Sequence, residues 1–304
     1  MSFSLTILGS SSALPTSKRF PTAQVVNLLE QFFLIDCGEG TQIQIRSSKI
    51  KLGKLNHIFI SHLHGDHYFG IFGLISTLGL LGRTSDLYIY SFPELKQMIN
   101  FQFKYYDNKL PFRIIYHYLD SKNHQVIYEN EKLQIESFPL KHRIPTCGFV
   151  FREKQKLSNI KKEMVDKYQI SIREIVKIKE GADYILSDGT IIKNEDITIS
   201  PPKPHSYAFC SDTIYREAII PYIKDVDLLY HEATFGKDQQ NRAKKTFHST
   251  ASQAAQIALL ANVKQLIIGH FSVRYKDINI LLKEAKVIFE NTLAAEDGKT
   301  YQIK

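Results

Sequence analysis

One segment of this chain constrains its fold more than any other, because an apolar run leads directly into three imidazoles and a carboxylate. The segment reads Ile58-Phe-Ile-Ser-His62-Leu-His64-Gly-Asp66-His67. If the apolar run is a β-strand, His62 and His64 lie two residues apart in extended chain and point to the same side, where both can bind one cation. Asp66 and His67 follow just past the turn and can bind a second. The spacing therefore predicts a metal centre at the carboxyl end of a strand.

Three further residues of the metal-ligand type occupy the same kind of position later in the chain. His142 follows an apolar run, Asp212 follows Tyr-Ala-Phe-Cys-Ser, and His270 follows Leu-Ile-Ile-Gly. Taken singly, each has an ordinary alternative, His142 and His270 as loop histidines and Asp212 as a helix cap. Their shared position after apolar runs favours a role as additional metal ligands.

Short β-rich runs alternate with helical runs in both halves of the chain. Strands are predicted at residues 5–8, 25–28, 32–35, 57–60, 87–90, 112–116, 133–138, 149–151, 207–210, 227–230 and 265–268. Helices are predicted at residues 41–48, 66–81, 94–106, 250–260 and 277–290, the fourth of them capped by Ser249. This alternation predicts an α/β fold.

One segment between the two halves has a different amino-acid composition. Residues 152–196 are rich in Lys and Glu and contain no histidine, and the loop Ser200-Pro-Pro-Lys-Pro204 follows them. We interpret residues 152–198 as an arm inserted into a single domain that spans residues 1–304. The alternative is a solvated excursion of the surface.

Composition narrows the setting in which the protein acts. Only three cysteines occur, at positions without paired spacing, so a reducing compartment is favoured over secretion. No apolar stretch reaches the roughly 18 residues of a membrane helix, and we expect a cytoplasmic protein without a membrane segment. The formal net charge of +8 favours a polyanionic partner.

Seven short motifs distributed over the chain identify the family that it resembles. They are Leu8-Gly-Ser-Ser-Ser-Ala-Leu-Pro15, Asp36-Cys-Gly-Glu-Gly-Thr-Gln42, residues 61–67, Ser211-Asp-Thr213, His231-Glu-Ala-Thr234, His248-Ser-Thr250 and Gly269-His-Phe-Ser-Val-Arg-Tyr275. With these motifs the chain resembles the metallo-β-lactamase superfamily and, within it, the ribonuclease Z family of tRNA 3′-processing endoribonucleases. The resemblance covers nearly the whole chain except the arm, and it implies a four-layer αββα sandwich from which the arm projects.

The resemblance also implies a particular metal centre. Two Zn²⁺ ions per subunit are expected, one bound by His62, His64 and His142 and the other by Asp66, His67 and His270, with Asp212 bridging them. Mn²⁺ or another divalent cation remains an alternative, because it accepts the same mixture of imidazole and carboxylate ligands. Asp66 would in addition orient the attacking water or take its proton.

Several residues outside the ligand set are assigned roles as well. His248 is the candidate general acid, and Glu232 would hold its imidazole protonated and oriented. Ser272 and Arg274 would hold the scissile phosphate, and Asp36 would support the ligands by accepting an imidazole N–H. The alternatives are a structural hydrogen-bonding role for Glu232, a helix start for His248 and a surface salt bridge for Arg274.

RNA contacts are expected beyond the catalytic residues. The family resemblance assigns tRNA binding to the arm, and it implies a homodimer. Basic residues crowd the segment that leads into His248, where backbone phosphates would pass: Lys237, Arg242, Lys244 and Lys245. A solvated basic face is the alternative for this cluster.

The predicted function is that of a zinc-dependent endoribonuclease which removes the 3′ trailer from precursor tRNA. Water would attack the phosphodiester 3′ of the discriminator base, leaving a 3′-hydroxyl on the tRNA and a 5′-phosphate on the trailer. One alternative is a metal-dependent small-molecule phosphodiesterase or arylsulfatase of the same superfamily. Another is a non-catalytic RNA-binding scaffold.

Overall fold

The computed structural model of the protein describes residues 3–105 and 110–303 and divides the chain into two compact units. The larger unit contains the described residues up to Tyr128, together with Ile135–Phe151 and the residues from His205 onwards. The smaller unit combines Glu129–Gln134 with Arg152–Pro204. None of the helices in the described part of the chain has the length and apolar character that a membrane crossing requires.

The first sheet of the larger unit has seven strands in the order β18-β1-β2-β3-β4-β5-β6. Their bounds are β1 (Phe3–Gly9), β2 (Ala23–Leu28), β3 (Gln31–Ile35), β4 (Leu55–Phe59), β5 (Leu87–Ser91), β6 (Ile114–Tyr118) and β18 (Thr300–Gln302). β1 pairs antiparallel with β18 and β2, and β2 pairs antiparallel with β3. From β3 to β6 the pairing is parallel, so the carboxyl ends of these strands share one edge of the sheet.

The second sheet also has seven strands, in the order β17-β16-β15-β14-β9-β8-β7. Their bounds are β7 (Gln125–Glu129), β8 (Leu133–Pro139), β9 (Cys147–Glu153), β14 (Ser206–Cys210), β15 (Leu228–Glu232), β16 (Gln265–Gly269) and β17 (Thr292–Ala294). β14 to β17 pair in parallel. In such sheets ligands bind outside the carboxyl ends of the strands, where the connecting loops gather.

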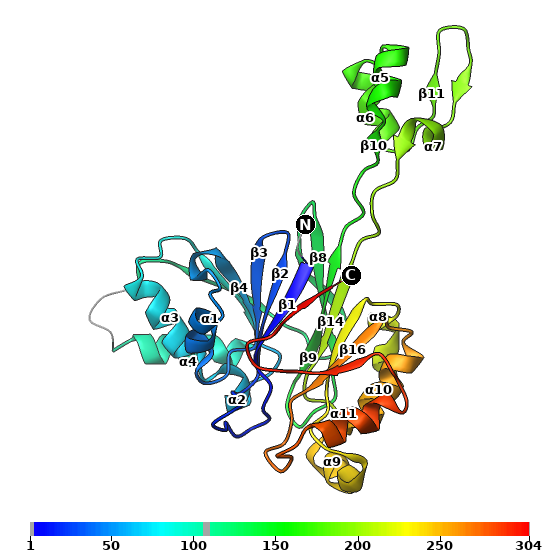
Figure 1. Ribbon diagram of the computed structural model, residues 1–304. Coiled ribbons are helices and arrows are strands. Elements are labelled where there is room, and N and C mark those ends of the chain that lie inside the picture. Colours follow the sequence, from blue (N-terminus) through cyan, green and yellow to red (C-terminus); the bar gives the residue numbers. More distant parts are fainter. Residues whose placement is uncertain (1–2, 106–109, 304) are drawn as a thin grey trace. The chain divides into compact units, whose positions relative to one another are not determined.

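Helices cover the outer faces of the two sheets (Figure 1). The first sheet carries α1 (Thr41–Ser47), α3 (Ile71–Leu80) and α4 (Pro93–Phe103), and the second carries α10 (Ala251–Leu260) and α11 (Asn279–Lys286). Shorter helices α2 (Gly65–Tyr68), α8 (Ile220–Ile223) and α9 (Gln240–Thr246) lie in the connections. The order of layers is helix, sheet, sheet, helix, which confirms the predicted α/β sandwich.

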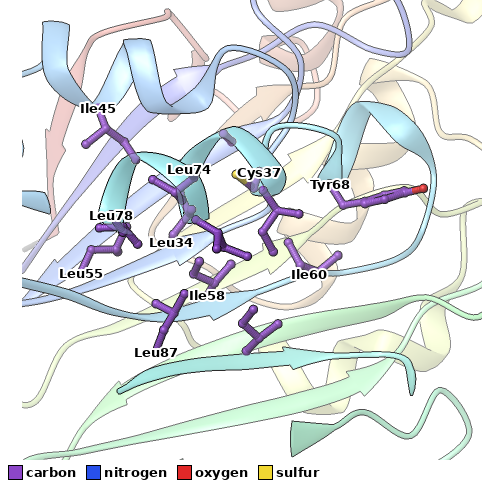
Figure 2. Close-up of a cluster of buried hydrophobic side chains, with 14 of the residues drawn as sticks. Leu34, Cys37, Ile45, Leu55, Ile58, Ile60, Tyr68, Leu74, Leu78 and Leu87 are labelled. Carbon is purple, nitrogen blue, oxygen red and sulfur yellow. The ribbon is translucent and has the colours of Figure 1, made fainter. Parts of the chain in front are cut away.

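Two apolar layers hold the larger unit together. In Figure 2, Leu34 and Ile58 of the first sheet pack against Leu74 and Leu78 of α3, all of them almost fully buried. Burying a leucine or isoleucine side chain stabilises the fold by roughly 1.5–3 kcal/mol. A second layer, between the sheets, is aromatic: it contains Phe33, Phe59, Phe149, Phe151 and Phe209, whose rings lie 5.6–6.3 Å from their neighbours. These layers fix the ends of the strands that carry the candidate ligands.

The prediction of one helix over residues 66–81 is wrong in one respect, because the structure has two helices there, α2 and α3. The chain breaks at Gly70, whose N–H donates to the Cys37 carbonyl oxygen. A β-carbon at this position would lie 2.0 Å from the Gly38 carbonyl oxygen, so the backbones approach too closely for any other residue. This close approach depends on a distant loop, which the local sequence pattern does not contain.

The predicted cap of α10 is wrong by one residue. Thr250 is the N-cap, and its side chain accepts from the Gln253 N–H while Gln253 accepts from the Thr250 N–H. Ser249 instead donates its hydroxyl to the Thr213 carbonyl oxygen at 2.7 Å. Strands β7, β17 and β18 were not predicted, and of the helix predicted over residues 94–106 the last residue lies outside the described part of the chain.

The smaller unit has secondary structure of its own. It contains α5 (Lys162–Tyr168), α6 (Ile172–Lys179) and α7 (Asn194–Ile197), the pair β10 (Asn159–Ile160) and β13 (Thr198–Ile199), and the pair β11 (Tyr184–Ile185) and β12 (Ile191–Ile192). Ile170, Ile178 and Ile197 form a buried apolar cluster among these elements. Most of the Lys- and Glu-rich segment is therefore a folded unit.

Candidate metal centre

Seven side chains predicted as ligands lie at the carboxyl ends of strands. His62 and His64 follow β4, Asp66 and His67 belong to the short helix α2, and His142, Asp212 and His270 follow β8, β14 and β16. They form two adjoining groups able to hold a metal ion, one of His62, His64, His142 and Asp212 and one of Asp66, His67 and His270. The described structure thus brings together all of the residues to which sequence reasoning gave this role.

The first group surrounds a point bounded by three imidazole nitrogens and one carboxylate oxygen. His64 Nδ1 lies 3.1 Å from His62 Nε2 and 3.2 Å from His142 Nε2. Asp212 Oδ2 lies 3.5 Å from His62 Nε2 and 3.6 Å from His142 Nε2.

The second group uses the other oxygen of the same aspartate. Asp212 Oδ1 lies 3.4 Å from His67 Nε2 and 3.1 Å from His270 Nε2, and these two nitrogens are 3.3 Å apart. Asp66 Oδ2 completes the group at 3.4 Å from His67 Nε2 and 3.5 Å from His270 Nε2. Asp212 therefore presents one carboxylate oxygen to each group, as a bridging ligand would.

These spacings match the coordination shell of a transition metal ion. Zinc bonds imidazole nitrogen and carboxylate oxygen at about 2.0–2.1 Å in tetrahedral geometry, which places ligand atoms roughly 3.3–3.4 Å from one another. Burial and the neighbouring charge of His67 lower the pKa of His62 to about 3, so this imidazole is neutral and offers a lone pair. Lone pairs facing one another at such distances repel unless a cation lies between them. The donor set fits a divalent metal.

The second ring nitrogens of four imidazoles are engaged by protein groups. The pairs are His62 Nδ1 with Ser61 Oγ (3.0 Å), His67 Nδ1 with Asp36 Oδ2 (2.7 Å), His142 Nδ1 with the Phe247 carbonyl oxygen (2.9 Å) and His270 Nδ1 with Thr234 Oγ1 (2.9 Å). Such contacts fix the tautomer and ring orientation of metal-binding histidines. The contact between Asp36 and His67 is the one that the sequence predicted for Asp36.

Asp36 is itself held firmly. It is completely buried, and its carboxylate accepts hydrogen bonds from the Ser61 N–H at 2.7 Å and the Ser61 hydroxyl at 2.9 Å. Burial raises the pKa of Asp36, while His67 and Ser61 act in the opposite direction. Three residues of this network, Asp36, Phe247 and His270, have φ angles of 55°, 59° and 59°, a left-handed conformation that is strained for residues other than glycine. The fold maintains this strain at the candidate centre.

Glu232 and His248 form a buried pair beside the ligands. Glu232 Oε1 lies 2.9 Å from His248 Nδ1, and Asp212 Oδ2 lies 4.0 Å from the same nitrogen. Burial lowers the pKa of His248, but the carboxylates of Glu232 and Asp212 outweigh it and raise the pKa to about 9. The imidazole is thus protonated at neutral pH and can donate a proton.

A cavity of about 360 Å³ opens onto the metal ligands and His248. Its walls are formed by Ser12, Ala13, His64, Gly65, Asp66, His142, Arg143, Asp212, Thr246, His248 and His270. The Ala13 N–H donates to Asp66 Oδ2 at 2.8 Å. Ser272 is buried and Arg274 exposed, and neither belongs to this wall.

Sequence reasoning missed two residues that organise the centre. Thr234 Oγ1 lies 2.7 Å from Glu232 Oε2 and 2.9 Å from His270 Nδ1, and so joins the Glu232–His248 pair to a metal ligand. Arg143 stands in the cavity wall directly after the ligand His142. The motif His231-Glu-Ala-Thr234 was a signal for the first, whereas nothing local distinguished the second from other exposed arginines.

Comparison with known proteins identifies the family. The chain is 54% identical to ribonuclease Z of Phocaeicola vulgatus over 295 residues, which are 97% of this chain and 96% of that protein. It is 50% identical to ribonuclease Z of Bacteroides fragilis over 97% of each. This chain belongs to the ribonuclease Z family. The predictions of this family and of a hydrolase of the ribonuclease Z type are confirmed.

Solved structures agree with this family. The crystal structure of human tRNase Z, short form, has a TM-score of 0.71 and 26% identity, and covers 99% of both chains. The metallo-β-lactamase fold protein YhfI of Bacillus subtilis has a TM-score of 0.70 and 18% identity, covers 99% of this chain and 100% of its own, and supports the fold. With these neighbours and the clustered His and Asp side chains, the ribonuclease Z chain described here has a metallo-β-lactamase fold and binds a divalent metal.

A family model described as Anti-Pycsar protein Apyc1 matches residues 3–159. The match spans just over half of the chain, which thus belongs to that family as well, through its N-terminal half. It includes the ligands from His62 to His142 and ends before Asp212, Glu232, His248 and His270. The ribonuclease Z relatives cover both parts of the centre.

Proposed function

We propose that this protein is a tRNA 3′-processing endoribonuclease that hydrolyses the phosphodiester bond 3′ of the discriminator base in precursor tRNA. The tRNA is left with a 3′-hydroxyl and the trailer with a 5′-phosphate. The observation that carries the proposal is the pair of Glu232 and His248, 2.9 Å apart, beside two adjoining groups of side chains able to hold a metal ion. A phosphodiester with a poor leaving group requires both an electrophilic centre and a proton donor.

The metal centre that we propose for these residues would hold two Zn²⁺ ions. His62, His64 and His142 would hold one ion, Asp66, His67 and His270 would hold the other, and Asp212 would offer one carboxylate oxygen to each group. When bound, two such cations supply an activated water molecule and offset the negative charge that develops on the phosphate. Mn²⁺ or another divalent cation is the alternative occupant.

The chain's own groups move the protons of the reaction. Asp66, which lines the cavity, orients the attacking water or accepts the proton that this water loses as its oxygen bonds to phosphorus. The bond between phosphorus and the ribose 3′ oxygen breaks, and His248 donates its proton to that oxygen. Glu232 keeps His248 charged and oriented, because its carboxylate stays within 2.9 Å of Nδ1.

Substrate binding extends beyond the reacting bond. Ser272 and Arg274 follow His270 in the chain and hold the scissile phosphate. The inserted arm, residues 152–198, binds the tRNA body, and its exposed lysines provide cations for this role, since phosphate contacts dominate affinity for RNA. We propose a homodimer that acts in the cytoplasm.

A direct assay tests the function. The metal-loaded protein is incubated with precursor tRNA labelled at either end, and the termini of the products are mapped. Cleavage 3′ of the discriminator with a 3′-hydroxyl on the tRNA is the expected result. Turnover of cyclic nucleotides or aryl sulfates without cleavage of the precursor would instead establish a small-molecule hydrolase, and binding without cleavage would establish a scaffold.

A further inference from the structure

Arg143 stands at the wall of the catalytic cavity, between the loop that carries the ligand His142 and the C-terminal end of α9. Its Nη2 donates to the Lys245 carbonyl oxygen at 3.4 Å, and the neighbouring His142 Nδ1 donates to the Phe247 carbonyl oxygen at 2.9 Å. Two adjacent residues therefore attach this loop to the segment that leads into His248. Arg143 therefore lines the same cavity as the ligands His142 and Asp212 and the proposed acid His248.

Arg143 has no carboxylate partner among the described residues. None of the ion pairs among the described residues includes Arg143, although the side chain is exposed. The carboxylates that share the cavity wall, Asp66 and Asp212, face the imidazole ligands. A guanidinium has five N–H donors, and the contact with Lys245 uses one of them. Its remaining donors suit a planar bidentate contact with phosphate oxygens.

Helix α9, which Arg143 contacts, carries further basic side chains. Arg242, Lys244 and Lys245 are exposed, and no carboxylate of the described residues forms an ion pair with them. Thr246, at the end of the same helix, lines the cavity together with Arg143. The cations of α9 thus belong to the helix whose last residue lines the catalytic cavity, where a polyanionic chain leaving the cavity can contact them.

We propose that Arg143 binds a backbone phosphate of the RNA adjacent to the scissile phosphate, and that it thereby positions the reacting bond between the metal ligands and His248. The inference rests on the proposed function and adds a substrate-binding residue to it. The competing role for Arg143 is structural, as a cationic side chain that stabilises the C-terminal end of α9.

Steady-state kinetics of the metal-loaded enzyme distinguish these roles. For Arg143→Ala we expect KM for precursor tRNA to rise about tenfold or more, since a charge-assisted contact is lost. The slope of log(kcat/KM) against log salt should fall by about 0.7–0.9, as for one phosphate contact. Arg143→Lys, which keeps the charge without the planar fork, should retain the salt slope and recover part of the loss in KM. Arg46→Ala, which removes an equally exposed cation from α1, should change neither quantity.

A substrate modification makes the test specific. Precursors with a single neutral methylphosphonate linkage next to the scissile bond, on its 5′ or its 3′ side, are compared in wild type and Arg143→Ala. One of the two linkages should weaken binding by the wild type and have little further effect in the variant, because both changes remove the same contact. Additive losses at both linkages would overturn the proposal, as would an unchanged KM and salt slope in a variant whose thermal stability falls.

A binding measurement separates this inference from the proposed function. Affinity for uncleaved precursor is measured in metal-loaded His248→Ala, with and without Arg143→Ala, and we expect the second substitution to weaken binding about tenfold. Equal affinities of the two variants would overturn the role of Arg143, and this result would not bear on whether the wild type cleaves the precursor. Absence of cleavage by the wild type would contradict the proposed function itself.

Discussion

The carboxylate of Glu232 and the imidazole of His248 lie 2.9 Å apart, in a position where the carboxylate is completely buried. An isolated buried carboxylate would be costly, but Glu232 also accepts hydrogen bonds from the Thr213 N–H at 3.1 Å and the Thr234 N–H at 3.0 Å. The fold therefore keeps Glu232 ionised without solvent. Among its partners His248 is the group that can carry a positive charge, so the Glu232 charge favours the protonated imidazole.

Glu232→Gln should shift the alkaline limb of the activity profile to lower pH. As the proton donor, His248 is active in its charged form, so activity falls as pH rises through its pKa, which lies at about 9 in the wild type. Removing the Glu232 charge removes the largest influence that raises this pKa, so the charged form is lost at lower pH. The measurement is kcat against pH on precursor tRNA, and an alkaline limb at the wild-type position would contradict the role of Glu232.

Asp212→Asn should reduce metal binding, because it removes the carboxylate whose two oxygens face both ligand groups. We expect the variant to retain fewer metal ions per chain after dialysis and to lose at least a hundredfold in kcat, as expected when electrostatic stabilisation of the transition state is removed. Metal content is measured by atomic absorption and folding by circular dichroism. Asp225→Asn, at an exposed carboxylate that belongs to neither ligand group, is the matched control and should keep its full metal content.

Thr234→Val should remove the hydroxyl that connects the Glu232–His248 pair to the candidate ligand His270. The substitution keeps the shape of the side chain but removes the hydroxyl that contacts Glu232 and His270. Because the buried Glu232 and His270 lose a hydrogen-bond partner, the free energy of unfolding should fall by about 1–3 kcal/mol. We expect a lower temperature of unfolding and a lower kcat, with Thr234→Ser close to the wild type. If Val and Ser variants have the same kcat, the hydroxyl has no role in the centre.

Replacing most of the smaller unit by a short linker should weaken tRNA binding more than it slows phosphodiester hydrolysis. Asn159 and Ile199 are paired across β10 and β13, so a short Gly-Ser linker can replace the residues between them without straining the chain. We expect KM for precursor tRNA to rise strongly, while hydrolysis of a small aryl phosphodiester continues at the rate of the intact protein. An unchanged KM would show that this unit does not bind tRNA.

Local geometry accounts for part of the grouping of the candidate ligands, and the family resemblance supplied the complete set. His62 and His64 are two residues apart at the end of an apolar strand, and the parallel strand ends that carry Asp212 and His270 meet at the same edge. By contrast, the double contact of Thr234 with Glu232 and His270 arises from chain segments up to 38 residues apart. No pattern along the chain specifies such a contact.

Other features escaped prediction for related physical reasons. The break between α2 and α3 depends on Gly70 approaching Gly38, a tertiary contact. The smaller unit combines two-residue strands with short helices, which are too brief for a clear period, and its buried cluster of Ile170, Ile178 and Ile197 is assembled from separate elements. Composition identified the segment but not its fold.

Anomalous X-ray scattering at the zinc edge, from crystals of the metal-loaded protein, tests the central claim most directly. The account predicts two peaks, one enclosed by His62, His64 and His142 and the other by Asp66, His67 and His270, with Asp212 between them. A single peak, peaks elsewhere on the molecule, or none at all would contradict it.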